Sequence, residues 1–200
     1  MYIPEHYRNE NLEEIRDFLR QHSFGILVST GPEGPMATHL PLEYEETGTG
    51  KGCIRGHFAK ANPQWKYLSD GAEVLCIFNG PHTYISSSWY REEEVPTWNY
   101  IAVHVRGRYR VQSPDELWTT LRQMVSKYEQ DSEDPVSLDA MSPATLRQVR
   151  GIVGFEIEVS GLEAAYKLSQ GREEDHGRII RELRKRGGGS SAVADAMDRP

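Results

Sequence analysis

The sequence predicts a mainly β protein: a small antiparallel barrel with helices added around it. Six or seven short apolar segments are separated by turn signals, as in all-β folds. Stretches with apolar residues at helical spacing stand between some of these segments and predict inserted helices. A barrel of this size fills its interior with side chains. We therefore expect any ligand at its mouth or at a dimer seam.

The elements are expected in the following order. Asn11 and Glu14 form a capping-box pattern at the start of a helix over residues 11–21. A hairpin follows, with strands over 24–30 and 36–44 around a glycine- and proline-rich turn. Apolar runs bounded by turn residues predict further strands over 53–58, 73–79, 83–86, 100–111 and 152–159. Proline after a capping residue, or apolar spacing, predicts helices over 63–68, from 114, from 143 and over 173–186.

The segment 100–111 is the clearest strand. Ile101, Val103, Val105, Tyr109 and Val111 alternate with small, polar or basic residues. This period of two predicts one face buried in the core and one polar, basic face.

Composition is that of an ordinary globular chain. The 200 residues are 38% hydrophobic and 26% charged. We expect a single domain over 1–186, followed by a disordered, glycine-containing tail over 187–200. No apolar run is long enough to span a membrane, and no signal-peptide pattern opens the chain. A cytoplasmic location without a membrane partner is therefore expected.

The sequence offers no catalytic or metal-binding motif. Cys53 and Cys76 are isolated and are interpreted as small hydrophobic residues in strands. His57, His82 and His104 share no ligand spacing, so no metal site is expected. Neither a nucleophile elbow nor a HExxH motif is found, so no catalytic residue is predicted and any reactivity would come from a bound cofactor.

Residues 56–100 hold most of the candidate binding groups. Three of the four tryptophans lie here among hydroxyl, amide and lysine side chains, which favours a pocket for a flat, anionic ligand. The alternative is a tryptophan-rich core with polar turns. Lys60, Asn62 and free backbone N–H groups where a strand enters a helix suggest a phosphate cradle, although a plain connection is the alternative. Thr38 and His39 either line such a pocket or are ordinary strand residues.

A basic cluster lies on the last predicted helix. It comprises Arg178, Arg181, Arg184, Lys185 and Arg186. These side chains could contact DNA phosphates, or they could simply suit a helix C-terminus. The net charge of −7 argues against broad, non-specific nucleic-acid binding.

Several longer motifs add a family resemblance. They are MYIPEHY, ATHLP, GHFAKANPQW, GPHTYISSSWY, VPTWNYIAVHVRG, IVGFEIEV and KLSQGR, which together cover most of residues 1–172. With these motifs the sequence resembles the PaiB family of FMN-binding negative transcriptional regulators, described as regulators of protease synthesis and sporulation. Ser87 is a mild departure, because family members often carry proline at that place.

The resemblance implies an FMN-binding split β-barrel of the pyridoxamine-phosphate-oxidase-like type, a homodimer with flavin at the subunit interface. By motif position it implies as flavin-site residues Thr38, His39, His57, Lys60, Asn62, Trp89, Trp98, Asn99, Lys167 and Ser169. Negative transcriptional regulation is implied by resemblance alone, and so is DNA as a partner. The alternatives are a flavin-dependent oxidoreductase using FMN at a dimer interface, and a split barrel that binds another planar ligand such as haem.

Overall fold

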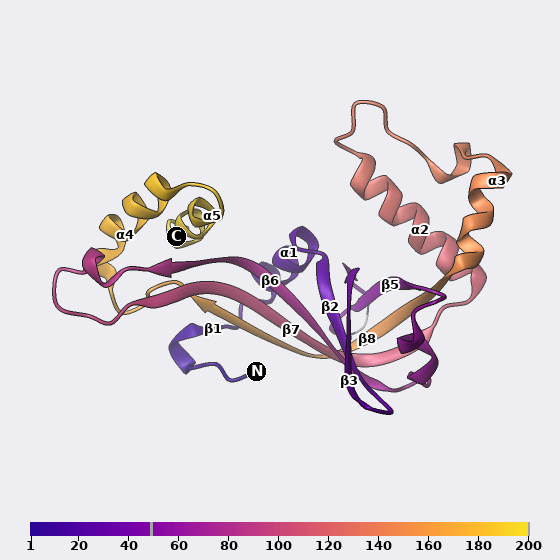
Figure 1. Cartoon of the computed structure of the whole chain (residues 1–200), viewed down its shortest axis with the longest axis horizontal. Coiled ribbons are helices and arrows are strands. Elements are labelled where there is room, and N and C mark those ends of the chain that lie inside the picture. Colours follow the sequence, from indigo (N-terminus) through magenta and orange to yellow (C-terminus); the bar gives the residue numbers. More distant parts are fainter. Residues whose placement is uncertain (49, 200) are drawn as a thin grey trace. The chain divides into compact units, whose positions relative to one another are not determined.

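The computed structural model describes residues 1–48 and 50–199, and its strands form one largely antiparallel sheet (Figure 1). Neighbouring strands follow the order β3–β2–β6–β7–β8–β5–β4, and β1 pairs with β8. The strands are β1 (Arg8–Asn9), β2 (Phe24–Gly31), β3 (Gly34–Pro41), β4 (Glu43–Glu45), β5 (Cys53–Ala59), β6 (Glu73–Ile85), β7 (Thr97–Val111) and β8 (Ile152–Lys167). The mainly β class with added helices is confirmed.

The helices are inserted between strands and follow the last strand. They are α1 (Leu12–Gln21), α2 (Pro114–Glu129), α3 (Pro143–Leu146), α4 (Glu173–Arg186) and α5 (Gly189–Met197). Short 3-10 helices are η1 (Glu5–Tyr7), η2 (Pro63–Tyr67), η3 (Ser87–Trp89), η4 (Leu138–Ala140) and η5 (Arg147–Gly151). Among the described residues, no helix combines the length and the apolar character that crossing a membrane requires.

The chain divides into two compact units. The first unit comprises Met1–Phe18, Phe78–His104 and Glu163–Pro200, and the second comprises Leu19–Ile77 and Val105–Leu162. Strands β6, β7 and β8 contribute residues to both units. The single domain expected over 1–186 remains a prediction.

The second unit is built on the β2–β3 hairpin and on the pairing of β5 with β8. The hairpin runs in register from Phe24 opposite Pro41 to Gly31 opposite Gly34. Its core contains Phe58, Tyr109 and Phe155, with ring centroids 4.9 Å apart for the two phenylalanines and 5.6 Å apart for Tyr109 and Phe155. Aromatic pairs at these separations add to the stabilisation from buried area.

Strand β7 approaches β8 closely at Gly107. A Cβ there would lie 2.4 Å from the carbonyl oxygen of Glu158 and 2.4 Å from Cγ2 of Ile157. Only glycine leaves room for this approach, because real Cβ atoms do not come so near to backbone atoms.

Both cysteines lie in strands of the second unit, as expected. Cys53 in β5 and Cys76 in β6 are free and buried. Burial raises the pKa of Cys53 to about 11 and that of Cys76 to about 12. Both thiols are therefore protonated at neutral pH and behave as small hydrophobic groups.

Several strand predictions need correction. The strand expected over 36–44 is divided into β3 and β4. The strands expected over 73–79 and 83–86 are one strand, β6, and the strand expected over 152–159 extends to Lys167 in β8. In β7, Val111 is 42% exposed instead of buried. Arg110 and Val111 in succession face away from the core, and Gln112 takes the buried place while its backbone N–H donates to the carbonyl of Gly154. The alternation of buried and exposed residues therefore predicts the middle of β7 correctly but fails at its last residues.

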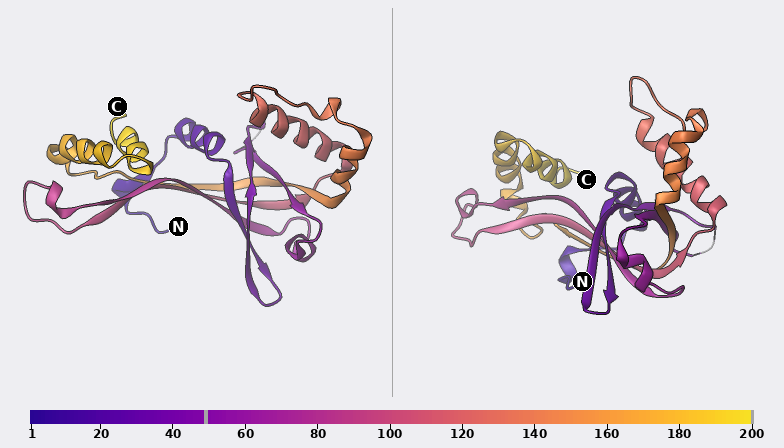
Figure 2. Two further views of the ribbon diagram at one scale, coloured as in Figure 1. Left: turned by 45° about the horizontal axis from the view of Figure 1, so that its top comes forward. Right: turned by 45° about the vertical axis from the view of Figure 1, so that its right-hand side comes forward.

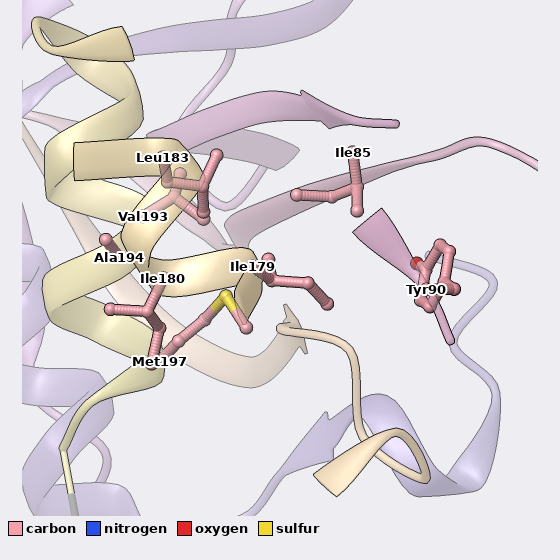
Figure 3. Close-up of a cluster of buried hydrophobic side chains, with 8 residues drawn as sticks. All are labelled: Ile85, Tyr90, Ile179, Ile180, Leu183, Val193, Ala194 and Met197. Carbon is pink, nitrogen blue, oxygen red and sulfur yellow. The ribbon is translucent and has the colours of Figure 1, made fainter. Parts of the chain in front are cut away.

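The disordered tail expected over 187–200 is wrong for Gly189–Met197, which forms α5. Figure 2 shows α4 and α5 side by side over one face of β6 and β7. Val193, Ala194 and Met197 of α5 are buried in a cluster with residues of α4 and β6 (Figure 3). The sequence signal was missed because α5 is short and has three successive glycines at its start: Gly187 and Gly188 before it and Gly189 as its first residue. The first two adopt positive φ values of 73° and 55°, which allow the sharp turn between the helices.

Helix α2 begins at Pro114, as the sequence predicts, and a capping box stabilises its start. The Ser113 hydroxyl accepts from the Glu116 N–H at 3.3 Å, and a Glu116 carboxylate oxygen accepts from the Ser113 N–H at 2.7 Å. Arg110 donates to the same carboxylate. Hydrogen bonding from Arg110, with smaller contributions from Ser113, lowers the pKa of Glu116 from 4.5 to about 2.

We predict that acid weakens the start of α2 through Glu116. Because its folded pKa lies below its ordinary value of 4.5, its contribution is present above pH 4.5 and is lost as the pH falls through about 2. Urea unfolding measured across this range should show a shallower pH dependence for Glu116→Gln than for the parent protein. Asp115→Asn, in the same turn, is the control. An unchanged slope in Glu116→Gln would contradict the prediction.

We also predict that Met197→Ala lowers the free energy of unfolding by about 2–5 kcal/mol, since it removes a side chain buried among α4 residues. Chemical denaturation measures this decrease. Ala192→Ser, at an exposed position of the same helix, should leave stability nearly unchanged. Equal stability of all three proteins would mean that α5 does not pack as described.

Candidate functional site

A polar network in the second unit joins two of the predicted flavin residues. Thr38 of β3 donates to Oε1 of Gln64 at 2.5 Å, and Nδ2 of Asn62 donates to the Thr38 hydroxyl at 2.9 Å. Oδ1 of Asn62 accepts from the Gln64 N–H at 2.9 Å and so caps η2. The network thus holds Thr38 and Asn62 together although they are 24 residues apart in the chain.

Gln64 is the residue of this network that sequence reasoning missed. Its side chain is fully buried, and Nε2 donates to Ser29 Oγ at 2.9 Å and to the carbonyls of Leu27 and Met36 at 3.2 and 3.3 Å. The available signal was its place directly after Asn62-Pro63, because a capped turn fixes the direction of the next side chain. Its bonding partners come from strands that no local pattern links to it.

Lys60 directly follows β5 and stands two residues before Asn62 in the chain, but the expected cradle of free backbone N–H groups is wrong. The N–H of Lys60 donates to the Gly151 carbonyl at 2.7 Å, and that of Asn62 donates to the Ala59 carbonyl at 2.9 Å. The exposed Lys60 side chain reaches the Arg150 carbonyl at 3.3 Å. Anion binding here therefore depends on the ammonium group of Lys60 and on side-chain donors.

The two histidines of the predicted site differ in environment. His39 is exposed and stacks on Phe24 with ring centroids 6.3 Å apart, on the face of β3 opposite to Thr38. His57 in β5 is half-buried, and its Nδ1 is buried without a hydrogen-bond partner among the described residues. Burial lowers the pKa of His57 below 6.5, so the ring is neutral at pH 7. Alternation along β3 is what separates His39 from Thr38.

The other five predicted flavin residues lie in the first unit, and Trp98 is the most exposed of them. Its side chain is 54% exposed on β7, and its ring lies 6.4 Å from His82 and 6.2 Å from Tyr84, both exposed on β6. These three rings, called here the aromatic face, lie on the same side of the two strands. They offer flat apolar area to a ligand or to a second molecule.

Asn99 and Ser169 are brought together, but inside the first unit. Asn99 is fully buried and donates to the Ser169 hydroxyl at 2.9 Å. It also approaches the Met197 sulfur at 3.5 Å. Ser169 adopts a φ of 64°, in the left-handed region that non-glycine residues rarely occupy. This pair holds the turn after β8, and both of its side chains are buried.

Lys167 and Trp89 also have partners within the first unit. Lys167 donates to the Thr97 hydroxyl and lies 5.6 Å from the centre of the Tyr7 ring, and burial lowers its pKa below 10.5. The guanidinium of Arg186 stacks over Trp89 at 4.6 Å. Trp89 packs against the α4–α5 cluster. The predicted flavin residues thus divide between the two units.

The basic cluster on α4 is largely paired with neighbouring groups. Arg184 binds Asp195 and Asp198 at 3.4 and 2.8 Å, and Lys185 binds Glu182 at 2.7 Å. Arg178 donates to the carbonyl of Ser88 at 2.9 Å. These pairings agree with the alternative interpretation, cations that suit a helix C-terminus. Within the described part of the chain, the exposed Arg181 forms no ion pair with a carboxylate. Among the described residues, no group of three or more His, Cys, Asp or Glu side chains is arranged to hold a metal.

Comparison with known proteins supports the fold and the cofactor. Residues 1–161 match the family described as "Putative FMN-binding domain". The chain is 47% identical over 185 residues to "Protease synthase and sporulation protein PAI 2" of Bacillus subtilis strain 168, covering 92% of this chain and 89% of that protein.

Solved structures share the architecture at low identity. The FAD and haem binding protein of Mycobacterium smegmatis aligns with a TM-score of 0.63 at 12% identity, over 86% of this chain and 79% of that one. The flavocytochrome Anf3 of Azotobacter vinelandii aligns with a TM-score of 0.65 at 12% identity, over 88% and 78%. At this identity the likeness shows the fold alone, and the split-barrel fold class is confirmed.

The family match covers most of the chain and confirms FMN as the cofactor that the resemblance implied. The identity to the Bacillus subtilis protein extends over nearly the full length of both chains. On these two findings, the chain belongs to the PaiB family of FMN-binding proteins.

Proposed function

We propose that this protein is a homodimeric, FMN-binding negative transcriptional regulator of the PaiB type. The observation that carries the flavin site is the network of Thr38, Asn62 and Gln64, with Lys60 two residues before Asn62 in the chain. The regulatory role rests on family membership, since the Bacillus subtilis relative is named as a protease synthase and sporulation protein. The cytoplasmic location remains a prediction of the sequence.

The side chains of this site suit a flavin nucleotide. Lys60 supplies an exposed positive charge for the phosphate, and Asn62 keeps a second N–H beyond the one it gives to Thr38. His57, neutral at pH 7, can donate or accept at its unpaired Nδ1. When bound, FMN supplies electron-transfer chemistry, and the protein supplies the site. Side chains suited to binding and orienting a flavin agree with flavin sensing.

A homodimer gives the aromatic face a role. Trp98, Tyr84 and His82 lie exposed on the first unit, where apolar rings in contact with water favour association. A second copy would cover these rings, and they could stack on a flavin held at the seam. Exposed Trp and Tyr are the side chains most enriched at the centres of protein interfaces.

DNA contact is proposed for the exposed side of α4. Arg181 is the leading candidate, and Arg178 comes next because it donates to a backbone carbonyl and not to a carboxylate. Arg184 and Lys185 are already balanced by carboxylates, so they contribute less to the attraction of phosphates. The acidic net charge of −7 restricts any such contact to a local surface.

We predict that FMN binds the purified protein with saturable quenching of flavin fluorescence, and that Lys60→Gln weakens this binding about tenfold, the equivalent of one charge-assisted hydrogen bond. Lys66→Gln is the matched control, because Lys66 is an exposed lysine on η2 that lies over the Trp65 ring. Size-exclusion chromatography with light scattering on the same samples gives the oligomeric state.

Two results would count against the flavin site. One is absence of FMN binding by the folded parent protein. The other is an equal decrease of affinity in Lys60→Gln and Lys66→Gln, which would indicate that only the overall charge matters. Consumption of a reduced nicotinamide faster than free FMN allows would favour the oxidoreductase alternative instead.

We predict that the protein retards a promoter fragment in a salt-dependent manner. Arg178→Gln with Arg181→Gln should reduce the slope of log affinity against log salt by about 2, one unit for each phosphate that is no longer neutralised. Arg8→Gln with Arg108→Gln, at exposed positions outside α4, removes the same charge as a control. An identical slope in both double variants would rule out α4 as the DNA contact.

A further inference from the structure

The second unit contains a cavity that the network of Thr38, Asn62 and Gln64 does not line. Its volume is about 700 Å³, within the range of roughly 300–1,000 Å³ typical of small-molecule sites. It lies where the first turns of α2, the α3–η5 segment and the start of β8 meet. The N–H of Gln112 donates to the carbonyl of Gly154 at 3.0 Å and fixes the start of α2 against β8. Figure 1 shows these elements in succession along the chain.

The wall of the cavity is mainly apolar. The apolar side chains that line it are Leu117, Trp118, Leu146, Val149, Ile152 and Val153. Leu117 is buried, while Trp118, Leu146 and Val149 are half-buried, so part of their surface faces the cavity. Such a wall favours a ligand with a hydrocarbon or aromatic body, because binding would remove apolar surface on both sides from water.

The charges at the cavity have one sign. Lys60, Arg147 and Arg150 line it, and among its described lining residues none is acidic. Three exposed cations beside an apolar wall attract an anion. A neutral apolar ligand would form no ion pair with these cations.

Gln112 provides a third, independent feature. Its side chain lines the cavity, and the residue is only 7% exposed. Nε2 donates to the Thr120 hydroxyl at 2.8 Å, but Oε1 is buried and has no hydrogen-bond partner in the described part of the chain. A buried acceptor without a donor is costly, and a ligand N–H or O–H group would satisfy it.

We propose that this cavity binds a small amphipathic organic anion. The ligand has an apolar body for the wall, an acidic group for Arg147 and Arg150, and an N–H or O–H donor for Gln112 Oε1. This inference does not depend on the flavin site, although Lys60 stands at the edge of both. In a regulator, such a ligand would be an effector that is sensed separately from the flavin.

Anilinonaphthalene sulfonate is a suitable probe, because it combines aromatic rings, a sulfonate and one N–H group. We predict that the folded protein binds one probe molecule per chain in a saturable manner. The rise in probe fluorescence measures this binding. Val149→Trp, which fills the cavity, should weaken binding at least tenfold, and Arg150→Gln about tenfold, the value of one charge-assisted contact. Gln112→Met should weaken it several-fold by removing the acceptor.

Matched controls separate cavity binding from general adsorption. Gln148→Trp adds the same ring at the adjacent, exposed position of η5, outside the cavity, and Arg181→Gln removes a cation on α4. Both should bind the probe like the parent protein. Thermal unfolding of every variant shows whether it is folded, and Arg150→Gln, which alters an exposed side chain, tests the proposal if Val149→Trp does not fold.

The titration is repeated with saturating FMN. Unchanged probe affinity supports a site separate from the flavin. Competitive displacement by FMN would overturn the proposal, because the cavity would then belong to the flavin site. Equal binding by the parent, Val149→Trp and Arg150→Gln proteins would also overturn it. Failure of FMN itself to bind would leave the probe result interpretable, so the two proposals can fail independently.

Discussion

The buried amide of Gln64 is the interaction on which the candidate flavin site depends. It bonds the carbonyl of Leu27 and the hydroxyl of Ser29 in β2, and the carbonyl of Met36 and the hydroxyl of Thr38 in β3. A fully buried polar side chain is tolerated only when its bonds are made, and here they tie η2 to the β2–β3 hairpin. Thr38 and Asn62 have defined positions because Gln64 satisfies these requirements.

The sequence was a good guide to local structure and to family, for physical reasons. Alternation along 100–111 predicts a strand because successive side chains of a strand point to opposite faces. Ser113 and Glu116 predict a helix start because a capping box involves only residues that are close in sequence. Prediction from the sequence failed where the structure depends on contacts between residues that are far apart in the chain. Val111 faces outward because the strand ends there, and Met197 is buried because α4 offers an apolar surface to α5.

The same division explains the site predictions. Motif position identified Thr38 and Asn62, which the structure joins, but alternation along β3 places His39 on the other face. Asn99 and Ser169 look like ligand-binding groups in sequence, yet they bond to each other inside the first unit. A polar residue in a family motif can stabilise its own turn or bind a ligand. Only its hydrogen-bond partners in the structure distinguish these two roles. Gln64 is the opposite case. It is a buried structural residue, and its role in positioning the site residues is visible only in the structure.

The two buried thiols have a practical consequence. Cys53 and Cys76 lie in β5 and β6, shielded from solvent and held as thiols by their raised pKa values. Alkylating reagents act on exposed thiolates, so each cysteine reacts only when its strand opens. The rate of alkylation in the native protein therefore reports how often two separate strands of the second unit open, and no added label is needed. A ligand that holds those strands closed would slow the reaction in proportion to its occupancy.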